Sequence, residues 1–363
     1  MMRNRKIQRW IIALLTLTCC CFAAAQSDDA PFETERFEFS VGGHQLVGLL
    51  DRPEDPLATI IIVPGYGETR VLEQNAWFGL RSFFAKLGLN VLIWDKRGCG
   101  ESEGEFDINQ PVASSAEEVV AAVQALRSHG LTGVERIGLW GVSRAGWIAP
   151  LAMQAEPDIA FWISVSGTDD KENARYLLES NWRIEGRSEA EVELLVSEWQ
   201  NGFNTAWQGG SYADYLAATT TLRDNPFMHF MGWGGSVSEA DFYAYQAQFE
   251  SGELRVDPET QLQIVVPDFR PLLSSIDRPV LALFGEKDTN VDWRSTAALY
   301  RETLGANPEA DLTLLTFPEA DHMIQLAETG GVREGRNRTE ARYPPGYAES
   351  MRHWLISQGL GRR

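Results

Sequence analysis

Three residues of this sequence, Ser143, Asp288 and His322, have the side chains that a nucleophilic reaction at a carbonyl carbon requires. Ser143 lies in the segment Gly-Val-Ser-Arg-Ala-Gly (141–146), which follows an apolar run at 136–140 and precedes a helical pattern. A sharp turn from a strand into a helix lifts a serine hydroxyl above the edge of a sheet. The segment therefore predicts that Ser143 is a nucleophile.

A serine hydroxyl is a weak nucleophile, so it needs a nearby base and a group that orients that base. His322 follows the last strand-like run, where a loop can return to the upper edge of the sheet. The other histidines fall in a hairpin, at a helix end, in the 169–277 interval and on the terminal helical segment (His44, His129, His229 and His353). His322 is therefore the predicted base.

The acid that orients the base is expected just after the strand-like run 280–284. A carboxylate there can accept a hydrogen bond from the imidazole and stabilise its cation. Asp288 fits this role best. Glu286 and Asp292 are alternatives, and Asp292 is close enough to the next helical segment to act as its N-cap.

An acyl-transfer reaction also needs hydrogen-bond donors for the oxyanion that forms on the carbonyl. The segment Val-Pro-Gly-Tyr-Gly (63–67) follows a central strand-like run, and its glycines allow the backbone N–H groups to turn outward. We predict that the backbone N–H groups of Tyr66 and Arg144 form this pair. The Arg144 side chain either contacts an acidic group of the substrate or lies exposed on the surface.

A second serine, Ser102, matches the literal Gly-x-Ser-x-Gly pattern in the segment 100–104. This segment lies in a polar loop that begins with Asp95-Lys96-Arg97-Gly98, with no strand before it and no helix after it. A serine in such a loop has neither the strained turn nor the helix N-terminus that the chemistry needs. Ser102 is therefore expected to be a structural residue.

The elements around these residues alternate between strands and helices. Two alternating apolar stretches in 32–51 flank Gly42-Gly43 and predict a β-hairpin. Continuous β-rich runs joined by helices indicate a mostly parallel sheet that is covered on both faces. The predicted strands are 59–63, 90–94, 136–140, 160–165, 280–284 and 312–317, and the predicted helices are 74–87, 112–129, 145–155 and 295–304.

The pattern divides the chain into four parts. Residues 1–25 read as a signal peptide, 26–168 as the first part of an α/β core, 169–277 as a mainly helical insertion and 278–363 as the second part of the core. The insertion is rich in tryptophan and tyrosine. We expect it to form a cap over the carboxyl ends of the strands, with aromatic residues lining a site.

The first 25 residues combine four basic residues, an apolar run at 10–22 and Ala23-Ala24-Ala25. This is the pattern of a cleaved signal peptide, so a periplasmic or secreted protein without a stable membrane span is expected. Lipidation at one of Cys19, Cys20 or Cys21 is the alternative. After cleavage only Cys99 is left, so no disulfide can form within the chain.

The charge of the chain is strongly negative. Lysine and arginine number 32 against 51 aspartate and glutamate residues, which gives a formal net charge of −19. Such a surface repels phosphate backbones, so nucleic-acid binding is not expected. We also find no HExxH motif, no paired Cys and His ligands and no dinucleotide glycine fingerprint in the sequence, so neither a metal nor an organic cofactor is predicted.

Taken as a set, these motifs resemble the α/β-hydrolase superfamily, and in particular its bacterial capped carboxylesterases related to dienelactone hydrolases and serine aminopeptidase-like proteins. The resemblance rests on the Pro-Gly-Tyr-Gly turn (64–67), the Asp-Lys-Arg-Gly-Cys-Gly-Glu-Ser loop (95–102), the Ser143 turn, the Asp288 loop and Asp321-His322. The chain order of nucleophile, acid and base is also that of this superfamily.

The resemblance covers most of 33–168 and 278–357, and it implies that the 95–102 loop is structural. Pro64 and Ala145 depart from the family pattern, since these positions often hold histidine and glycine.

The residues and the resemblance together predict a serine hydrolase that cleaves small carboxylic esters through an acyl-enzyme. A peptidase or amidase with the same triad is one alternative. A noncatalytic member of the fold that binds an apolar ligand is another, because the fold alone does not decide the function.

Overall fold

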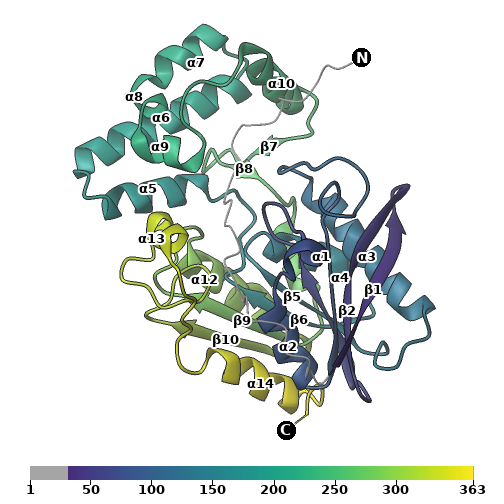
Figure 1. The fold of residues 1–363 in the computed structure, drawn as a ribbon. Helices are drawn as coiled ribbons and strands as arrows, with labels where there is room; N and C mark the ends of the chain where they lie inside the picture. Colours follow the sequence, from purple (N-terminus) through teal and green to yellow (C-terminus); the bar gives the residue numbers. More distant parts are fainter. Residues whose placement is uncertain (1–31, 363) are drawn as a thin grey trace. The chain divides into compact units, whose positions relative to one another are not determined.

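The computed structural model describes residues 32–362, so the predicted signal peptide and the lipidation alternative lie outside the described residues. The chain forms two compact units (Figure 1). The larger unit contains residues 32–169 and 268–362. The smaller unit is Asp170–Pro267, which we call the insertion. Within the described part of the chain, no helix is both long and apolar enough to cross a membrane.

The larger unit is built on an eight-stranded sheet with the order β1-β2-β4-β3-β5-β6-β9-β10. The first two strands form an antiparallel hairpin, β2 pairs antiparallel with β4, and all other pairs are parallel. The strands are β1 (Phe32–Val41), β2 (His44–Pro53), β3 (Ala58–Val63), β4 (Leu89–Trp94), β5 (Ile137–Val142), β6 (Ile159–Val165), β9 (Val280–Gly285) and β10 (Leu312–Phe317). The predicted hairpin and mostly parallel sheet are confirmed.

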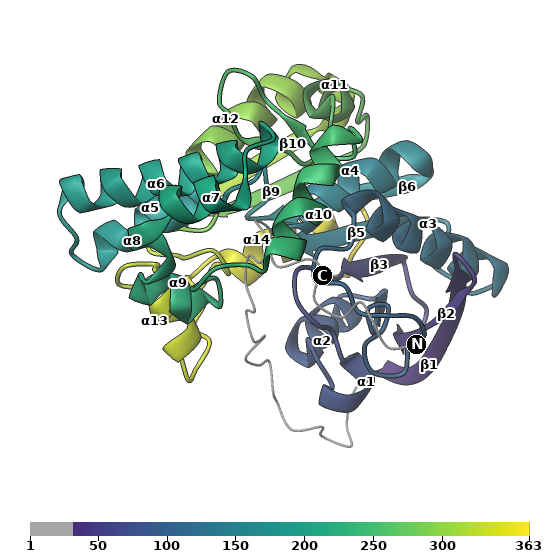
Figure 2. The ribbon, with the colours of Figure 1, turned by 90° about the horizontal axis from the view of Figure 1, so that it is seen from above.

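Helices cover both faces of this sheet (Figures 1 and 2), and two neighbouring residues of β6 demonstrate this. Successive side chains of a strand point to opposite faces. The ring of Phe161 packs on Trp354 of α14, whereas Trp162 packs on Tyr300 of α12. The helices of this unit are α1 (Val71–Gln74), α2 (Phe78–Lys86), α3 (Val112–Ser128), α4 (Ala145–Ala155), α11 (Phe269–Ser274), α12 (Trp293–Thr303), α13 (Val332–Asn337) and α14 (Tyr347–Ser357), with short 3₁₀ turns η1 (Leu304–Ala306) and η2 (Pro308–Ala310).

Burial on both faces explains why the central strands read as continuous apolar runs rather than as alternating patterns. Every residue of β3, β4, β5 and β9 is buried.

One prediction needs correction, because residues 74–87 do not form a single helix. Asn75 and Trp77 adopt left-handed backbone conformations, with φ of 48° and 61°. Such residues interrupt the helical hydrogen bonds, so α1 ends and α2 begins at this point.

The insertion is mainly helical, as predicted. Its helices are α5 (Ala174–Ile184), α6 (Glu189–Trp207), α7 (Tyr212–Ala218), α8 (Thr220–Arg223), α9 (Pro226–Met231) and α10 (Glu239–Glu250), and a two-stranded sheet pairs β7 (Arg255–Val256) with β8 (Gln263–Ile264). Aromatic rings form its core, among them Phe203, Tyr215, Phe242 and Tyr245. Ser188 and Ser211 cap α6 and α7 through reciprocal bonds with Glu191 and Asp214. These caps satisfy N–H groups that have no acceptor within the helix.

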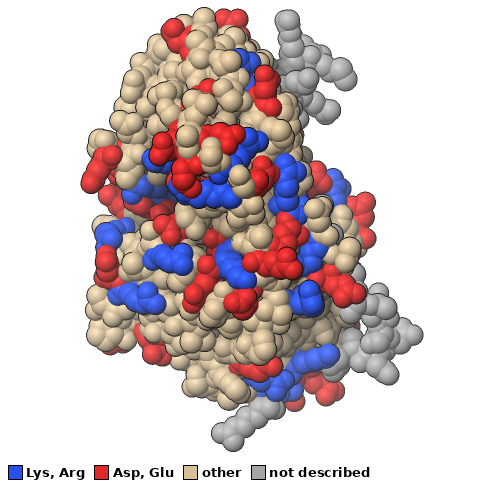
Figure 3. All heavy atoms as spheres, turned by 90° about the vertical axis from the view of Figure 1, so that its left-hand side faces the viewer, with Lys and Arg blue, Asp and Glu red and all other residues tan. Residues whose placement is uncertain are grey.

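The surface carries side chains of both signs. On the face drawn in Figure 3, acidic and basic residues are interspersed rather than separated. This is typical of a solvated surface, and it accompanies the formal net charge of −19.

Among the described residues, Cys99 is a buried free cysteine.

A buried ion pair joins the hairpin to α2. The Arg81 guanidinium donates two hydrogen bonds to the Asp51 carboxylate, from Nε to Oδ2 at 2.7 Å and from Nη2 to Oδ1 at 2.6 Å. Both side chains are at most 1% exposed. The Thr34 hydroxyl also donates to the Asp51 carboxylate, and Arg81 donates a further hydrogen bond to the Asn75 side-chain oxygen. All four polar groups are therefore satisfied inside the unit.

We predict that Asp51→Asn lowers the free energy of unfolding by about 3–5 kcal/mol, because it leaves the Arg81 cation buried without its counter-charge. Urea titration followed by circular dichroism measures this loss. The matched control is Glu302→Gln, which breaks an ion pair with Arg270 in which both side chains are 59% exposed. This control should change stability by less than about 1 kcal/mol. Equal effects of the two substitutions would contradict the prediction.

Candidate active site

Ser143 lies in a strained turn between β5 and α4. Its backbone is left-handed, with φ of 58°, a conformation that residues other than glycine rarely adopt. The Ser143 N–H donates to the Val165 carbonyl of the neighbouring strand at 3.0 Å, and its own carbonyl accepts from the Gly146 N–H at 2.7 Å. The turn therefore has the geometry of the nucleophile elbow expected from the sequence.

The small residues around Ser143 are required by close approaches of the backbone. A Cβ atom added to Gly141 would lie 2.3 Å from the Cβ of Ala145, and one added to Gly146 would lie 2.7 Å from the Thr168 nitrogen. Glycine at 141 thus leaves room for the methyl group of Ala145. The departure from the family pattern at 145 fits inside the turn for this reason.

Asp288 and His322 form a buried hydrogen-bonded pair. The His322 Nδ1 lies 2.8 Å from Asp288 Oδ2, and the two residues are 3% and 2% exposed. The other Asp288 oxygen accepts from the backbone N–H groups of Asn290 at 2.8 Å and Val291 at 3.0 Å. The carboxylate is therefore fixed on both sides, and it fixes the imidazole in turn.

This pairing determines what His322 can do. Because Asp288 accepts a hydrogen bond from Nδ1–H, the neutral imidazole carries its lone pair on Nε2, which is the acceptor a base needs. Nε2 is buried and makes no hydrogen bond to any residue in 32–362. A bond from the Ser143 hydroxyl to Nε2 is likewise not formed within the described chain, and such bonds often tighten only with substrate. The contact between Ser143 and His322 stays a prediction.

The sheet explains why these residues, which are distant in sequence, belong to one region. Ser143 follows β5, Asp288 follows β9 and His322 follows β10. These three strands run in the same direction within one parallel array. Their carboxyl ends therefore lie along the same edge, where ligands of open α/β sheets bind.

The turn 64–67, which contains the predicted oxyanion donor Tyr66, is held by a lysine that sequence reasoning missed. Lys96 Nζ donates to the carbonyl groups of Gly65 at 3.1 Å and Gly67 at 3.2 Å. Burial, and secondarily the charge of Arg144, lowers the pKa of Lys96 to about 8. The only signal in the sequence was the position of Lys96 just after a buried strand.

The alternative that the Arg144 side chain lies exposed on the surface was wrong, because Arg144 is 1% exposed. Contact of this side chain with an acidic group of the substrate stays a prediction. Its guanidinium donates to the Ser115 hydroxyl at 3.0 Å and to the Gln110 carbonyl, and it lies over the Tyr66 ring at 5.4 Å. The Arg144 side chain therefore connects the start of α4 to the segment around Gln110 and Ser115 and to the Tyr66 turn.

Ser102 is a structural residue, as expected. It is 8% exposed, its hydroxyl donates to the Asp95 carbonyl at 2.6 Å and it accepts from the Val47 N–H at 2.9 Å. Asp95 itself accepts from the N–H groups of Val71 and Glu101. The loop 95–102 therefore ties β2, β4 and α1 together.

The alternative acids have other partners. Asp292 accepts from the N–H groups of Arg294 and Ser295 and so caps α12, and Glu286 accepts from the Thr316 hydroxyl at 2.7 Å.

Two of the other histidines also lie where another role or none is expected. His129 bonds the Ala125 carbonyl at the end of α3, whereas His353 is exposed on α14. Across residues 32–362, no cluster of three or more His, Cys, Asp or Glu side chains is arranged to hold a metal ion.

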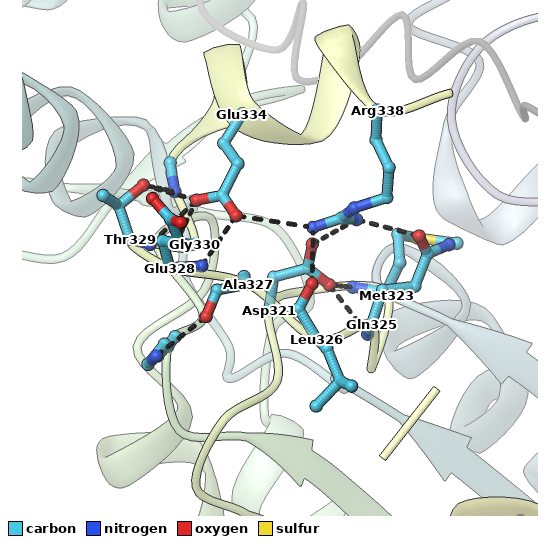
Figure 4. A network of polar contacts seen from close by, with 12 residues as sticks. Asp321, Met323, Gln325, Leu326, Ala327, Glu328, Thr329, Gly330, Glu334 and Arg338 are labelled. Carbon is cyan, nitrogen blue, oxygen red and sulfur yellow. Dashed lines mark hydrogen bonds and ion pairs between the residues drawn. The ribbon is translucent and has the colours of Figure 1, made fainter. Parts of the chain in front are cut away.

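A polar network orders the loop that follows His322 (Figure 4). Arg338, directly after α13, pairs with Asp321 at 2.7 Å and donates to the Gln325 side chain at 2.8 Å. Asp321 in turn accepts from the N–H groups of Met323 and Gln325. Asp321, which precedes the candidate base, is therefore held by an arginine 17 positions further along the chain, a link that no local motif revealed.

Glu334 of α13 holds the far end of the same loop. Its carboxylate accepts from the N–H groups of Glu328, Thr329 and Gly330 and from the Thr329 hydroxyl. Burial by itself would raise the pKa of Glu334, but these hydrogen bonds outweigh it and lower the pKa to about 2. The Thr289 hydroxyl, next to Asp288, donates to the Gly330 carbonyl at 2.9 Å. The acid loop and the base loop are thus connected.

Comparisons with known proteins bear on the family and the fold. The family model of X-Pro dipeptidyl-peptidases (S15 family) matches residues 42–182, less than half of the chain. The structure is similar to that of the esterase Pf2001 of Pyrococcus furiosus, with a TM-score of 0.54, 16% sequence identity and coverage of 91% of this chain and 92% of the other. At this identity the likeness concerns the fold.

Two fungal proteins are similar in sequence over a shorter stretch. An acyltransferase of Aspergillus calidoustus is 28% identical over 30% of this chain and 34% of its own length. A thiohydrolase of Arthrinium phaeospermum is 27% identical over 36% of this chain and 42% of its own length. The chain therefore matches less than half of the length of these curated relatives.

The depressed pKa of Glu334 predicts a pH-dependent contribution to stability. Because the folded pKa lies below the ordinary value of 4.5, the contribution is complete above about pH 4.5 and is lost as the pH falls toward 2. Because solvent screens the partly exposed carboxylate, the contribution is about 1–2 kcal/mol. The stability difference between wild type and Glu334→Gln, measured by urea unfolding, should be largest at pH 6 and should shrink at pH 3.

The matched control for this experiment is Glu340→Gln, because Glu340 is an exposed carboxylate close to α13. It should cost less than about 1 kcal/mol at either pH, as expected for an exposed charge. A Glu334→Gln deficit that is the same at pH 6 and pH 3 would refute the role of the ionised carboxylate.

Proposed function

We propose that this chain, a member of the α/β-hydrolase superfamily by its fold and its sequence matches, is a serine hydrolase that cleaves small carboxylic esters. Ser143 is the nucleophile, His322 the general base and Asp288 the residue that orients the base. The backbone N–H groups of Tyr66 and Arg144 form the oxyanion hole. No cofactor takes part in this proposal.

The observation that carries the proposal is the buried hydrogen bond of 2.8 Å between Asp288 and His322. It leaves Nε2 as the proton acceptor of the imidazole, at the sheet edge where the left-handed Ser143 also lies. A histidine used only for packing would have no need of a carboxylate that is itself held by two backbone N–H groups. The arrangement suits proton transfer at a serine hydroxyl.

The reaction has two halves. In the first, Ser143 Oγ attacks the ester carbonyl while Nε2 of His322 takes the hydroxyl proton, and the two N–H groups hold the negative oxygen. The intermediate collapses, the alcohol leaves with the proton from His322, and the acyl group stays on Ser143. In the second half, water gives its proton to His322 and attacks the acyl ester, and the carboxylic acid leaves as Ser143 is restored.

Amide hydrolysis by the same residues is the second candidate. It is favoured by the match to X-Pro dipeptidyl-peptidases, which spans both the turn 64–67 and Ser143. That match ends at residue 182, before Asp288 and His322, so it says nothing about how the leaving group is protonated. A noncatalytic ligand-binding protein is the third candidate, and the intact set of serine, aspartate and histidine argues against it.

We further propose that the protein acts in the periplasm or after secretion and that the insertion caps the site. The first proposal rests on the basic and apolar pattern of residues 1–25. The second rests on the position of the insertion between β6 and β9, whose carboxyl ends border the candidate site.

Ser143→Ala should abolish labelling by a fluorophosphonate probe and reduce kcat/KM for p-nitrophenyl acetate by at least about 1,000-fold, because the acyl-enzyme can no longer form. Active-site labelling on a gel and initial rates measure the two effects. Ser102→Ala is the matched control, since Ser102 satisfies the literal motif but lies in a structural loop; it should label like wild type. Labelling of Ser143→Ala at the wild-type level would refute the assignment.

The ester and amide candidates differ in their preferred substrates. We expect kcat/KM for short p-nitrophenyl acyl esters to exceed that for aminoacyl and X-Pro p-nitroanilides by at least about 100-fold, or about 2.7 kcal/mol in transition-state stabilisation. Rates on both series with wild type and Ser143→Ala give the answer. Faster hydrolysis of the anilides would favour the peptidase instead.

A further inference from the structure

The insertion contains a cavity of about 260 Å³ that is lined entirely by its own residues. The lining comes from the helices α5 to α9, from Thr219 between α7 and α8, from the loop 232–238 and from the first turn of α10. Protein interiors are packed without voids of this size. An apolar cavity of about 150 Å³ is known to admit benzene, and typical small-molecule sites begin near 300 Å³. The cavity therefore has room for one ring with a short chain.

Aromatic rings make up much of the wall. Trp199 and Phe203, one turn apart on α6, stack with ring centroids 6.0 Å apart and planes 4° from parallel. Tyr215 and Trp233 also line the cavity. Trp199, Phe203 and Tyr215 are each at most 7% exposed. Such a wall favours a flat or branched apolar group, and the faces of its rings carry partial negative charge that attracts cations.

The cavity wall also includes a carboxylate with an unusual position. Asp241 is the third residue of α10, and its N–H donates to the capping Ser238 hydroxyl. In α6 and α7 the third residues, Glu191 and Asp214, bond back to the capping serine and complete a reciprocal cap. The Asp241 carboxylate makes no such return bond, and it finds no hydrogen-bond donor or ion pair among residues 32–362, although Asp241 is only 8% exposed.

Asp241 as a residue is nine-tenths buried, and a carboxylate that is partly removed from water in this way is costly unless a cation or several donors compensate it. A second polar group of the same wall is also unsatisfied, since the Trp233 indole N–H is buried and has no acceptor in the described chain. An apolar cavity does not explain either group. The carboxylate and the aromatic wall together suit a ligand that has an apolar body and a positively charged end. The indole N–H is a donor, so the ammonium group does not satisfy it and it serves only to report on the cavity wall.

We propose that the cavity binds an organic ammonium ion whose body is one aromatic ring or a branched aliphatic group. The ammonium group pairs with Asp241 beside the aromatic faces, and the body fills the space along Trp199, Phe203 and Met228. This proposal does not depend on the proposed function, because every lining residue belongs to the insertion.

The test is isothermal titration calorimetry of the full chain with two probes of the same shape, 3-phenylpropylamine and 3-phenylpropan-1-ol, at pH 7. Wild type should bind the ammonium probe at least tenfold more tightly than the alcohol. Asp241→Asn, which keeps the shape of the side chain, should abolish that preference. Asp214→Asn is the matched control, because it changes the equivalent residue of α7, which does not line the cavity, and it should preserve the preference.

Equal affinities of the two probes for wild type, or a preference that survives in Asp241→Asn, would overturn the proposal. A second measurement does not need the Asp241 variant to fold. In ¹⁵N-tryptophan spectra of the wild-type chain, the indole resonance that disappears in Trp233→Phe should shift as the amine is added. If that resonance stays in place while the amine binds, the amine binds elsewhere and the proposal fails. Labelling of Ser143 by fluorophosphonate is a separate readout and reports on the proposed function alone.

Discussion

The direction of the strands is the constraint on which the candidate site depends. In a parallel array, every strand ends at the same edge, so the segments after β5, β9 and β10 meet there, although the segment after β5 is more than a hundred residues from the other two in sequence. Ser143, Asp288 and His322 each follow one of these strands. An antiparallel arrangement would divide the same residues between two edges. The hydrophobic burial that builds the sheet therefore also gathers the polar groups.

The strands bring the residues to one edge, and buried polar contacts in the loops set their orientation. Lys96 holds the turn of Tyr66, Asp95 secures the loop that contains Ser102, and Arg338 clamps Asp321 beside His322. Each of these contacts joins segments that are far apart in the chain. Loops that lack regular secondary structure are ordered in this way because each buried polar group has to find a partner.

The elements that depend on local pattern could be predicted from the sequence, and those that depend on distant contacts could not. The hairpin and the sheet strands are visible because burial on both faces leaves continuous apolar runs such as 137–142. Ser143 stood out because its segment connects a strand to a helix. In contrast, the roles of Lys96 and Arg144 depend on neighbours 29 to 34 residues away, and the role of Arg338 depends on a partner across a loop. A charged side chain is usually exposed, so residue type alone gave no reason to expect these three to be buried or paired. The break between α1 and α2 was missed for a different reason, since the left-handed backbone of Asn75 and Trp77 leaves no mark in the pattern of apolar residues. The contact of Ser143 with His322 stays a prediction.

The left-handed backbone of Ser143 has a consequence for how this chain changes over time. A residue with a Cβ atom in that conformation costs about 1–2 kcal/mol, and glycine would avoid most of the cost. Folding alone would thus favour glycine at position 143, and the proposed role of the hydroxyl would explain why serine stands there. Under that proposal, a duplicated copy freed from its chemistry would be expected to lose this serine early, since the substitution that ends activity would also relax the fold.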